Sequence, residues 1–316
     1  MPRKPIVVGV DDSLESRRAL ALAWKIAQAA RAELIAVHAV PDLWLATGLD
    51  ETPVVLPEVQ DALTSASRAQ IERVIGEVLP HSAVRRLEVR AGPAAFAVAE
   101  VARKRRAELV VLGGKHHTAL ARGLGRSTAH YLVRTLDVPV LVVGQALGPA
   151  TRVLAAVDLS GAAIPTIKAG ERCAKLLGGK LRILHVLEPL RLLYLPVDAL
   201  DQVAYERHAR EAFERLVAPM PAVVLEDQVV RTGPAVETIL AEVAAWQADV
   251  LVVGSHGKGW VDRLLVGSTT EQLVNALPAS VLVIPTAAAA KKGRGARPRT
   301  RARARTHKAK AARKRA

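Results

Sequence analysis

The residues best suited to chemistry in this chain form a glycine-rich loop in its second half. In order, the loop and the residues that follow it include Gly254, His256, Gly257, Gly267, Ser268 and Thr269. Glycine has no Cβ, so the backbone can approach an anion closely, and the amides and dipole of a following helix favour negative charge. No Gly-Lys-Ser/Thr sequence follows, which excludes a P-loop. The residue types and their spacing indicate a phosphate-binding loop of another kind.

A strand and a helix must position this loop. The apolar run Asp249–Val253 comes directly before it and predicts a buried parallel strand. The segment Ser268–Leu277 comes after it and predicts a helix with Ser or Thr at its N-cap. The loop amides are therefore expected at the carboxyl edge of a sheet, beside a helix N-terminus.

The spacing G-x2-G-x9-G-S resembles the nucleotide-binding signature of the universal stress protein family. Further matches are the strand Val153–Val157 with Asp158 at its end, the strand that contains His185 and Val186, and Gly233-Pro234 before a third helix. The resemblance extends from about Thr151 to Pro285.

This resemblance implies that ATP binds in the second half of the chain. The residues implied for the phosphates are Gly254, Gly257, Gly267, Ser268 and Thr269, with His256 as a further loop residue that could touch them. Val186 would lie against the adenine, and Asp158 would accept hydrogen bonds from the adenine or ribose edge. Mg²⁺ would bridge the phosphates with few protein ligands.

Several of these residues also have plainer interpretations. Asp158 could start the following helix together with Ser160. His185, and His38 in the first half, lie inside apolar strands and fit structural roles. Glu271, in the first turn of its helix, favours a capping role.

The sequence contains no metal-ligand cluster, nucleophile elbow or positioned pair of carboxylates, so no catalytic residues are predicted. Slow hydrolysis of bound ATP stays open. Besides an ATP-binding stress-response regulatory or protective module, the alternatives are a slow ATPase and a nucleic-acid-associated protein.

The chain repeats itself. Asp11 and Asp158, like His38 and His185, lie 147 residues apart. Three later pairs lie 141 residues apart, namely Gly92 and Gly233, Gly113 and Gly254, and Ser127 and Ser268. One length difference, expected in a surface loop at Pro41–Pro57, accounts for the change. Duplicated domains are predicted over residues 1–147 and 150–287.

Each half predicts five strands that alternate with helices. The strands are expected near 5–10, 33–40, 84–90, 108–113 and 139–143, and near 152–157, 180–187, 223–231, 249–254 and 280–284. Near-continuous apolar strands between helices predict a parallel α/β sheet covered on both faces. The family resemblance implies a Rossmann-like fold of the adenine nucleotide alpha hydrolase type with strand order 3-2-1-4-5. Ligands bind such sheets where strands 1 and 4 meet.

The first half departs from the glycine pattern. His116 stands where the second half has Gly257, Arg126 stands at the position of Gly267, and Ala39 replaces Val186. The bulk of Arg126 is expected to obstruct an anion, although a shift by one residue could use Gly114 and Gly125. One competent site per chain is predicted.

The fifth strands are apolar edge candidates that need covering, at Pro139–Val143 and Ala279–Ile284. Domains of the family pair through this strand, so the resemblance implies a pseudo-dimer within one chain. Whether two chains associate into a homodimer is left open.

The net charge of +15 comes almost entirely from the C-terminus. Residues 291–316 hold thirteen Lys or Arg and no acid, which leaves 32 basic against 30 acidic side chains elsewhere. Residues 288–316 are predicted to be a disordered basic tail. Such a tail could give salt-dependent, nonspecific contact with nucleic acid or another polyanion, without base stacking because aromatics are absent.

Cysteine and hydropathy set the remaining expectations. The single cysteine, Cys173, excludes an internal disulfide and is expected to be a small core residue. No apolar run reaches the length of about 18 residues that a membrane span needs. The N-terminus shows no signal-peptide pattern, so a cytoplasmic protein is expected.

Overall fold

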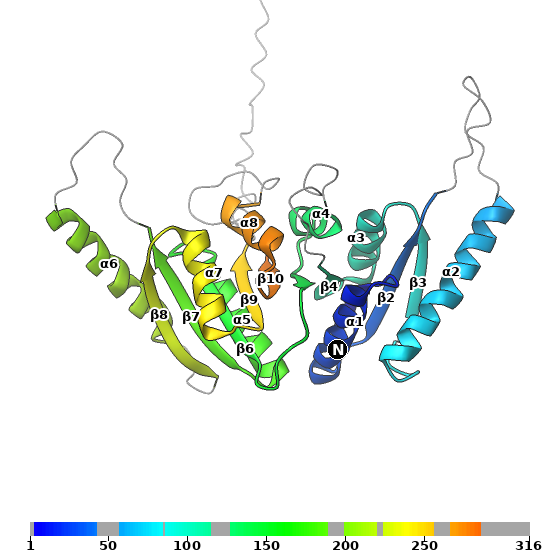
Figure 1. Ribbon diagram of the computed structural model, residues 1–316, viewed down its shortest axis with the longest axis horizontal. Coiled ribbons are helices and arrows are strands. Elements are labelled where there is room, and N and C mark those ends of the chain that lie inside the picture. Colours follow the sequence, from blue (N-terminus) through cyan, green and yellow to red (C-terminus); the bar gives the residue numbers. More distant parts are fainter. Residues whose placement is uncertain are drawn as a thin grey trace, which may run out of the picture. The chain divides into compact units, whose positions relative to one another are not determined.

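A computed structural model describes residues 3–42, 57–84, 86–114, 127–188, 199–219, 224–255 and 266–285. In this part of the chain, strands and helices alternate along the sequence (Figure 1). The first half contains β1 (Ile6–Gly9), α1 (Leu14–Ala30), β2 (Leu34–Val40), α2 (Pro57–Val78), β3 (Arg86–Ala91), α3 (Ala94–Arg105), β4 (Leu109–Gly113), α4 (Thr128–Thr135) and β5 (Val140–Val143). The second contains β6 (Arg152–Val157), α5 (Ala163–Leu177), β7 (Lys180–Leu187), α6 (Ala199–Val217), β8 (Leu225–Thr232), α7 (Ala235–Trp246), β9 (Val250–Gly254), α8 (Ser268–Ala276) and β10 (Ser280–Ile284).

The strands form one sheet of order β3-β2-β1-β4-β5-β10-β9-β6-β7-β8. Within each half the strands are parallel and follow the order 3-2-1-4-5, which confirms the predicted fold. The halves join where β5 pairs antiparallel with β10, with Leu141 opposite Leu282. The pairing of fifth strands that the family resemblance implied is therefore present within a single chain.

The apolar strands are explained by cover on both faces of the sheet. In β1, Ile6 and Val8 contribute to the core on one face, together with side chains of α1, α2, α5 and α6. Val7, between them, contributes to the core on the other face with α3, α4, α7 and α8. Successive strand residues point to opposite faces, so both sets must be apolar when neither face meets water. Cys173 lies in the first core, where burial raises the pKa of its thiol to about 12, and this confirms the predicted core role.

A buried carboxylate fastens the segment between the halves. Asp249 accepts hydrogen bonds from the backbone N–H of Gly148 at 2.7 Å and of Arg152 at 2.8 Å. Asp249 directly precedes β9 and is buried. The chain is thus held at the point where it passes from β5 to β6.

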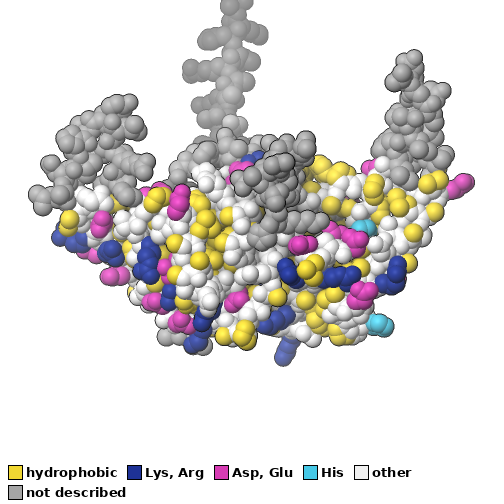
Figure 2. All heavy atoms as spheres, in the orientation of Figure 1, with side chains coloured by type: hydrophobic (Ala, Val, Ile, Leu, Met, Phe, Trp, Pro, Cys, Tyr) yellow, Lys and Arg dark blue, Asp and Glu magenta, His cyan; other side chains and the backbone are white. Residues whose placement is uncertain are grey.

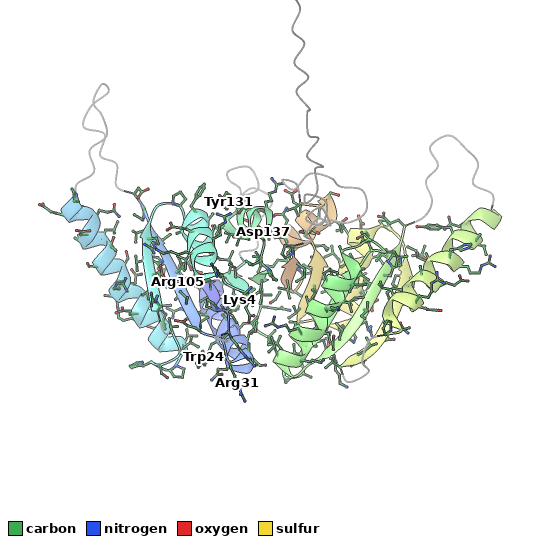
Figure 3. The ribbon with its side chains drawn as sticks, turned by 180° about the vertical axis from the view of Figure 1, so that it is seen from behind. Lys4, Trp24, Arg31, Arg105, Tyr131 and Asp137 are labelled. Carbon is green, nitrogen blue, oxygen red and sulfur yellow. The ribbon has the colours of Figure 1, made fainter. Side chains whose placement is uncertain are left out.

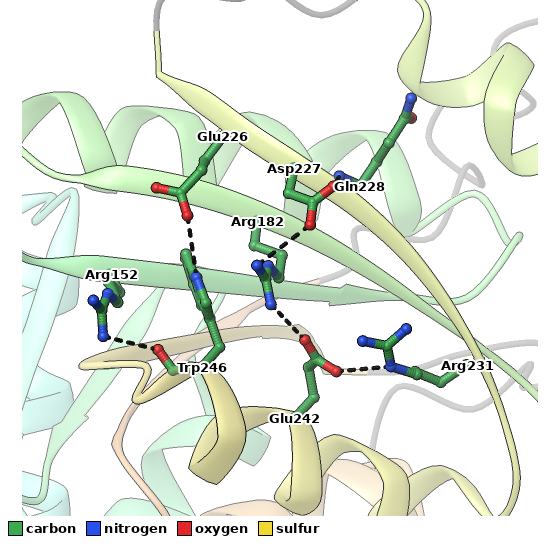
Figure 4. A network of polar contacts seen from close by, with 8 residues as sticks. All are labelled: Arg152, Arg182, Glu226, Asp227, Gln228, Arg231, Glu242 and Trp246. Carbon is green, nitrogen blue, oxygen red and sulfur yellow. Dashed lines mark hydrogen bonds and ion pairs between the residues drawn. The ribbon is translucent and has the colours of Figure 1, made fainter.

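A second buried carboxylate lies between arginines beneath the outer strands of the second half (Figure 4). Glu242 of α7 accepts from Arg182 of β7 at 2.7 Å and from Arg231 of β8 at 2.9 Å. The guanidinium of Arg182 also lies over the Trp246 ring, 4.6 Å from its centroid. Glu242 is 5% exposed, so these partners replace the water that its charge would otherwise need.

The first half also buries a carboxylate between arginines, but there the carboxylate comes from a strand and not from a helix. Glu88, on β3, is 7% exposed and pairs with Arg90 and with Arg105 of α3, each at 2.6 Å (Figure 3 shows Arg105). On the face shown in Figure 2, basic and acidic side chains lie interspersed over the described residues. This agrees with the near balance of charge expected outside the basic tail.

Replacement of Glu242 by Ala should lower the free energy of unfolding by about 3 kcal/mol, because Arg182 would lose its main partner inside the protein. Urea denaturation followed by circular dichroism measures the change. Glu211→Ala is the matched control, since Glu211 is half-exposed and only pairs along α6 with Arg215. Equal losses in the two variants would contradict this assignment.

Glu88 should make stability depend on pH. Burial raises the pKa of its carboxyl, but hydrogen bonds and charges from Arg105 and Arg90 outweigh burial and hold the pKa below its ordinary value of 4.5. A lowered folded-state pKa contributes stability that is complete above the unfolded pKa and is lost as pH falls through the folded one.

The Glu88→Gln variant is therefore expected to be less stable than the wild type at pH 7, by about 2 kcal/mol, and to approach it below about pH 4. Urea denaturation across this pH range tests the expectation, with Glu72→Gln on the exposed face of α2 as control. A difference that stays constant down to pH 3 would contradict it.

Candidate functional site

An open cavity of about 620 Å³ lies at the carboxyl ends of β6 and β9 in the second half. These two strands are neighbours, and they correspond to strands 1 and 4 of the predicted order. The direction of winding reverses between them, which is where open α/β sheets bind ligands. The volume falls within the range of small-molecule sites.

Six of the eight predicted site residues line this cavity. They are Asp158, Val186, Gly254, Gly267, Ser268 and Thr269. The other two, His256 and Gly257, lie outside the described residues. The sequence therefore identified residues from three separate strand ends and one helix that the fold brings to a single cavity.

Sequence reasoning missed one wall of the cavity. Tyr205, His208 and Ala209 of α6 also line it, as does Ile239 of α7. These side chains lie on amphipathic helices and belong to no motif. Only knowledge of where α6 and α7 lie on the sheet would have revealed them.

The N-terminus of α8 differs from the prediction. Ser or Thr was expected at its N-cap, but the cap position is Gly267 and no described side chain caps the helix. The backbone explains why. Gly267 N–H donates to the Ser255 carbonyl at 2.9 Å, and Thr270 Oγ1 donates to the Gly254 carbonyl at 2.7 Å. These bonds fasten the first turn to the end of β9, so the helix already begins at Ser268.

The first amides of a helix have no acceptor within it. In α8 they receive none from a described side chain, and they lie where Ser268 and Thr269 border the cavity. Ser268 is exposed and Thr269 half-buried. This end of the cavity thus offers backbone donors, two hydroxyls and the positive end of a helix dipole.

Asp158, which follows β6, is held by its neighbours. Its carboxylate accepts from Ser160 Oγ at 2.6 Å and from Ser160 N–H at 3.3 Å, while Ser160 Oγ accepts from Ala162 N–H. The interpretation that Asp158 and Ser160 organise the start of α5 is therefore supported. The same side chain also borders the cavity.

The two strand histidines have structural hydrogen bonds. His185 Nδ1 lies 2.8 Å from the Val157 carbonyl, and His38 Nδ1 lies 2.8 Å from the Val10 carbonyl. Because a carbonyl only accepts, Nδ1 carries the proton in both. His185 is also buried and stacks on Phe213. The structural interpretation of both histidines is supported.

The first half has its own cavity of about 420 Å³, lined among others by Asp11, His38, Ala39 and Gly113. Here the matched helix, α4, is capped, because Ser127 Oγ accepts from His130 N–H at 3.3 Å. His116, Gly125 and Arg126 lie outside the described residues.

Gly114, considered as a shifted anion-binding glycine, lines the first-half cavity and also has a packing role. A Cβ at this position would lie 2.5 Å from Leu277 Cδ2. Gly114 is therefore required for contact with the second half of the chain. Glu271 was expected to cap its helix and instead pairs with Arg134 of α4 at 3.2 Å.

No group of three or more His, Cys, Asp or Glu side chains within the described ranges could hold a metal ion. No helix among those described is long and apolar enough to cross a membrane. The basic run 291–316 lies outside the described residues.

Comparison with known proteins identifies the chain. The model of the universal stress protein family matches residues 2–144 and again residues 149–285. The chain belongs to this family. Two consecutive matches make it a tandem universal stress protein, a member of a stress-response family.

Relatives of this tandem universal stress protein match it over nearly their whole length. It is 30% identical over 297 residues to a universal stress protein of Mycobacterium tuberculosis strain H37Rv, covering 89% of this chain and 98% of that relative. A universal stress protein of Mycolicibacterium smegmatis is 27% identical over 289 residues, covering 88% and 96%.

Solved structures show the same fold. A universal stress protein from Archaeoglobus fulgidus aligns with a TM-score of 0.61 at 19% identity, over 89% of this chain and 98% of its own. A putative universal stress protein from Pseudomonas aeruginosa aligns with a TM-score of 0.62 at 19% identity, over 89% and 93%.

The capping difference between the two halves is directly testable at matched serines. Ser127→Ala should lower the free energy of unfolding by about 1 kcal/mol, because it removes the cap of α4. Ser268→Ala should change it by less than about 0.5 kcal/mol, since Ser268 caps no helix. Chemical denaturation of both variants measures these values. Equal losses would contradict the asymmetry.

Proposed function

We propose that this tandem universal stress protein binds one ATP per chain in the second-half cavity and acts as a regulatory or protective module in the stress response. The observation that carries the proposal is the N-terminus of α8, which borders the cavity and has no side-chain cap among the described residues.

The phosphates would lie at the α8 end of the cavity. Backbone amides from Gly267 onward and the hydroxyls of Ser268 and Thr269 offer donors there, and the helix dipole adds favourable charge. In the first half, Ser127 Oγ accepts from one amide of the first turn of α4, that of His130, at 3.3 Å. His116 and Arg126 stand there at the positions of Gly257 and Gly267, which supports a single phosphate site per chain.

The adenosine would lie across the strand ends. Val186 is half-buried and lies between the buried Leu184 and the end of β7, in an apolar part of the cavity that also contains Ile239. These side chains suit the face of a purine. Asp158 borders the cavity, and its ionised carboxylate would accept hydrogen bonds from the adenine or ribose.

Mg²⁺ would enter with the nucleotide. The described part of the cavity offers hydroxyls and two carboxylates, Asp158 and Glu188, rather than a cluster of three or more acidic ligands. An ion held mainly by phosphates and water fits this set, because Mg²⁺ keeps several waters and needs few protein ligands. The proposal concerns binding, and the cavity residues are assigned no part in turnover.

Isothermal titration of the full chain with ATP and Mg²⁺ should give a stoichiometry of one. Gly267→Arg should abolish binding, because its side chain would occupy the space next to the α8 amides. The matched control is Gly76→Arg on the exposed face of α2, where a Cβ meets only an ordinary contact with His81 at 3.7 Å.

Circular dichroism of both variants separates loss of the site from loss of the fold. A stoichiometry of zero or two for the wild type would contradict the proposal. Equal ATP affinity in Gly267→Arg and the wild type would also do so.

A further inference from the structure

Helix α8 borders the cavity of the second half and also the cavity of the first half. Its first turn, with Ser268 and Thr269, lines the cavity of the second half. Val274, Asn275 and the following Leu277 line the cavity of the first half. The matched helix α4 lines only the first-half cavity. The helix that presents the candidate phosphate site is therefore seated on the other half of the chain.

A packing contact holds the C-terminal end of α8 against the first half. Leu277 adopts a left-handed backbone conformation with φ of 44° and is 3% exposed. Its side chain lies against Gly114 and Gly144 of the first half, where a Cβ would come within 2.5 and 3.0 Å of it. These two glycines thus leave the room that Leu277 occupies.

An ion pair holds the N-terminal part of α8 against α4. Arg134 of α4 donates from Nη2 to both carboxylate oxygens of Glu271, at 3.4 and 3.2 Å. The two side chains are 21% and 40% exposed. The matched positions in the repeat carry Asn275 and His130, so the first half receives no reciprocal ion pair.

Glu271 follows Thr269 by two residues, within the first turn of α8. A carboxylate there stabilises the helix, but it also repels any anion that approaches the same amides. A guanidinium at hydrogen-bond distance offsets that repulsion. The first half contributes this guanidinium.

We infer that Arg134 is a positioning residue of the second-half site, which raises its affinity for phosphate groups by neutralising Glu271. The inference rests on the proposed ATP site and assigns the first half a part in it. Because the effect is electrostatic, it grows with ligand charge, from none for adenosine to the largest for ATP.

Titration calorimetry of the full chain with adenosine, AMP and ATP tests the inference. Arg134→Ala should weaken ATP binding by about three- to tenfold, as expected when the Glu271 carboxylate near the phosphates loses the guanidinium that neutralises it. Adenosine binding should stay unchanged. Arg134→Lys should retain most of the ATP affinity. The double variant Arg134→Ala, Glu271→Gln should return to wild-type affinity, because the unpaired carboxylate is gone.

Arg17→Ala is the matched control, since Arg17 pairs with Glu77 between α1 and α2 and lines neither cavity. Its ATP affinity should equal that of the wild type. Equal weakening of adenosine and ATP by Arg134→Ala, or failure of Glu271→Gln to restore binding, would overturn the inference. A wild-type protein that binds no ATP would instead refute the proposed function itself, so the two failures are distinguishable.

Discussion

The structure depends on the pairing of two apolar strand edges. All residues of β5 and of β10 are buried, although each strand is the last of its own half. A single half would expose one edge of unpaired backbone groups and apolar side chains, which favours aggregation. The antiparallel β5–β10 pair satisfies both edges at once. It also brings α4 and α8 close enough for Arg134 to reach Glu271.

The two halves share one architecture, but the residues that form the buried ion pairs and the helix caps differ between them. Both halves bury one carboxylate between arginines, but Glu88 comes from a strand and Glu242 from a helix. Both halves begin a helix at the end of the fourth strand, but only α4 receives a side-chain cap. The fold therefore constrains the place of an interaction more strongly than the residue that provides it. At the helix N-termini the divergence moves the cap position, which is Ser127 in α4 but Gly267, one residue before the matched Ser268, in α8.

Much of the fold followed from the sequence, because the apolar runs depend on residues close together along the chain and the repeat is visible directly as constant offsets of 147 and 141 residues. Asp158 and Gly254 were recognised by their place at strand ends, and the topology brings them to one cavity. The uncapped start of α8 was not predictable, because it depends on the bond between Thr270 and the Gly254 carbonyl. The contacts of Leu277 with Gly114 and of Arg134 with Glu271 depend on the register of β5 against β10, which no local pattern contains.

The connection between β5 and β6, which Asp249 fastens through Gly148 and Arg152, has a consequence for symmetry. This covalent connection makes the association of the two strand edges intramolecular, at high effective concentration. In a dimer of identical subunits, an isologous interface makes every residue form the same contacts on both sides. A fused pair is free of that requirement. Arg134 and Glu271 can face each other without a mirrored pair, and one half can become a support while the other keeps an open helix end.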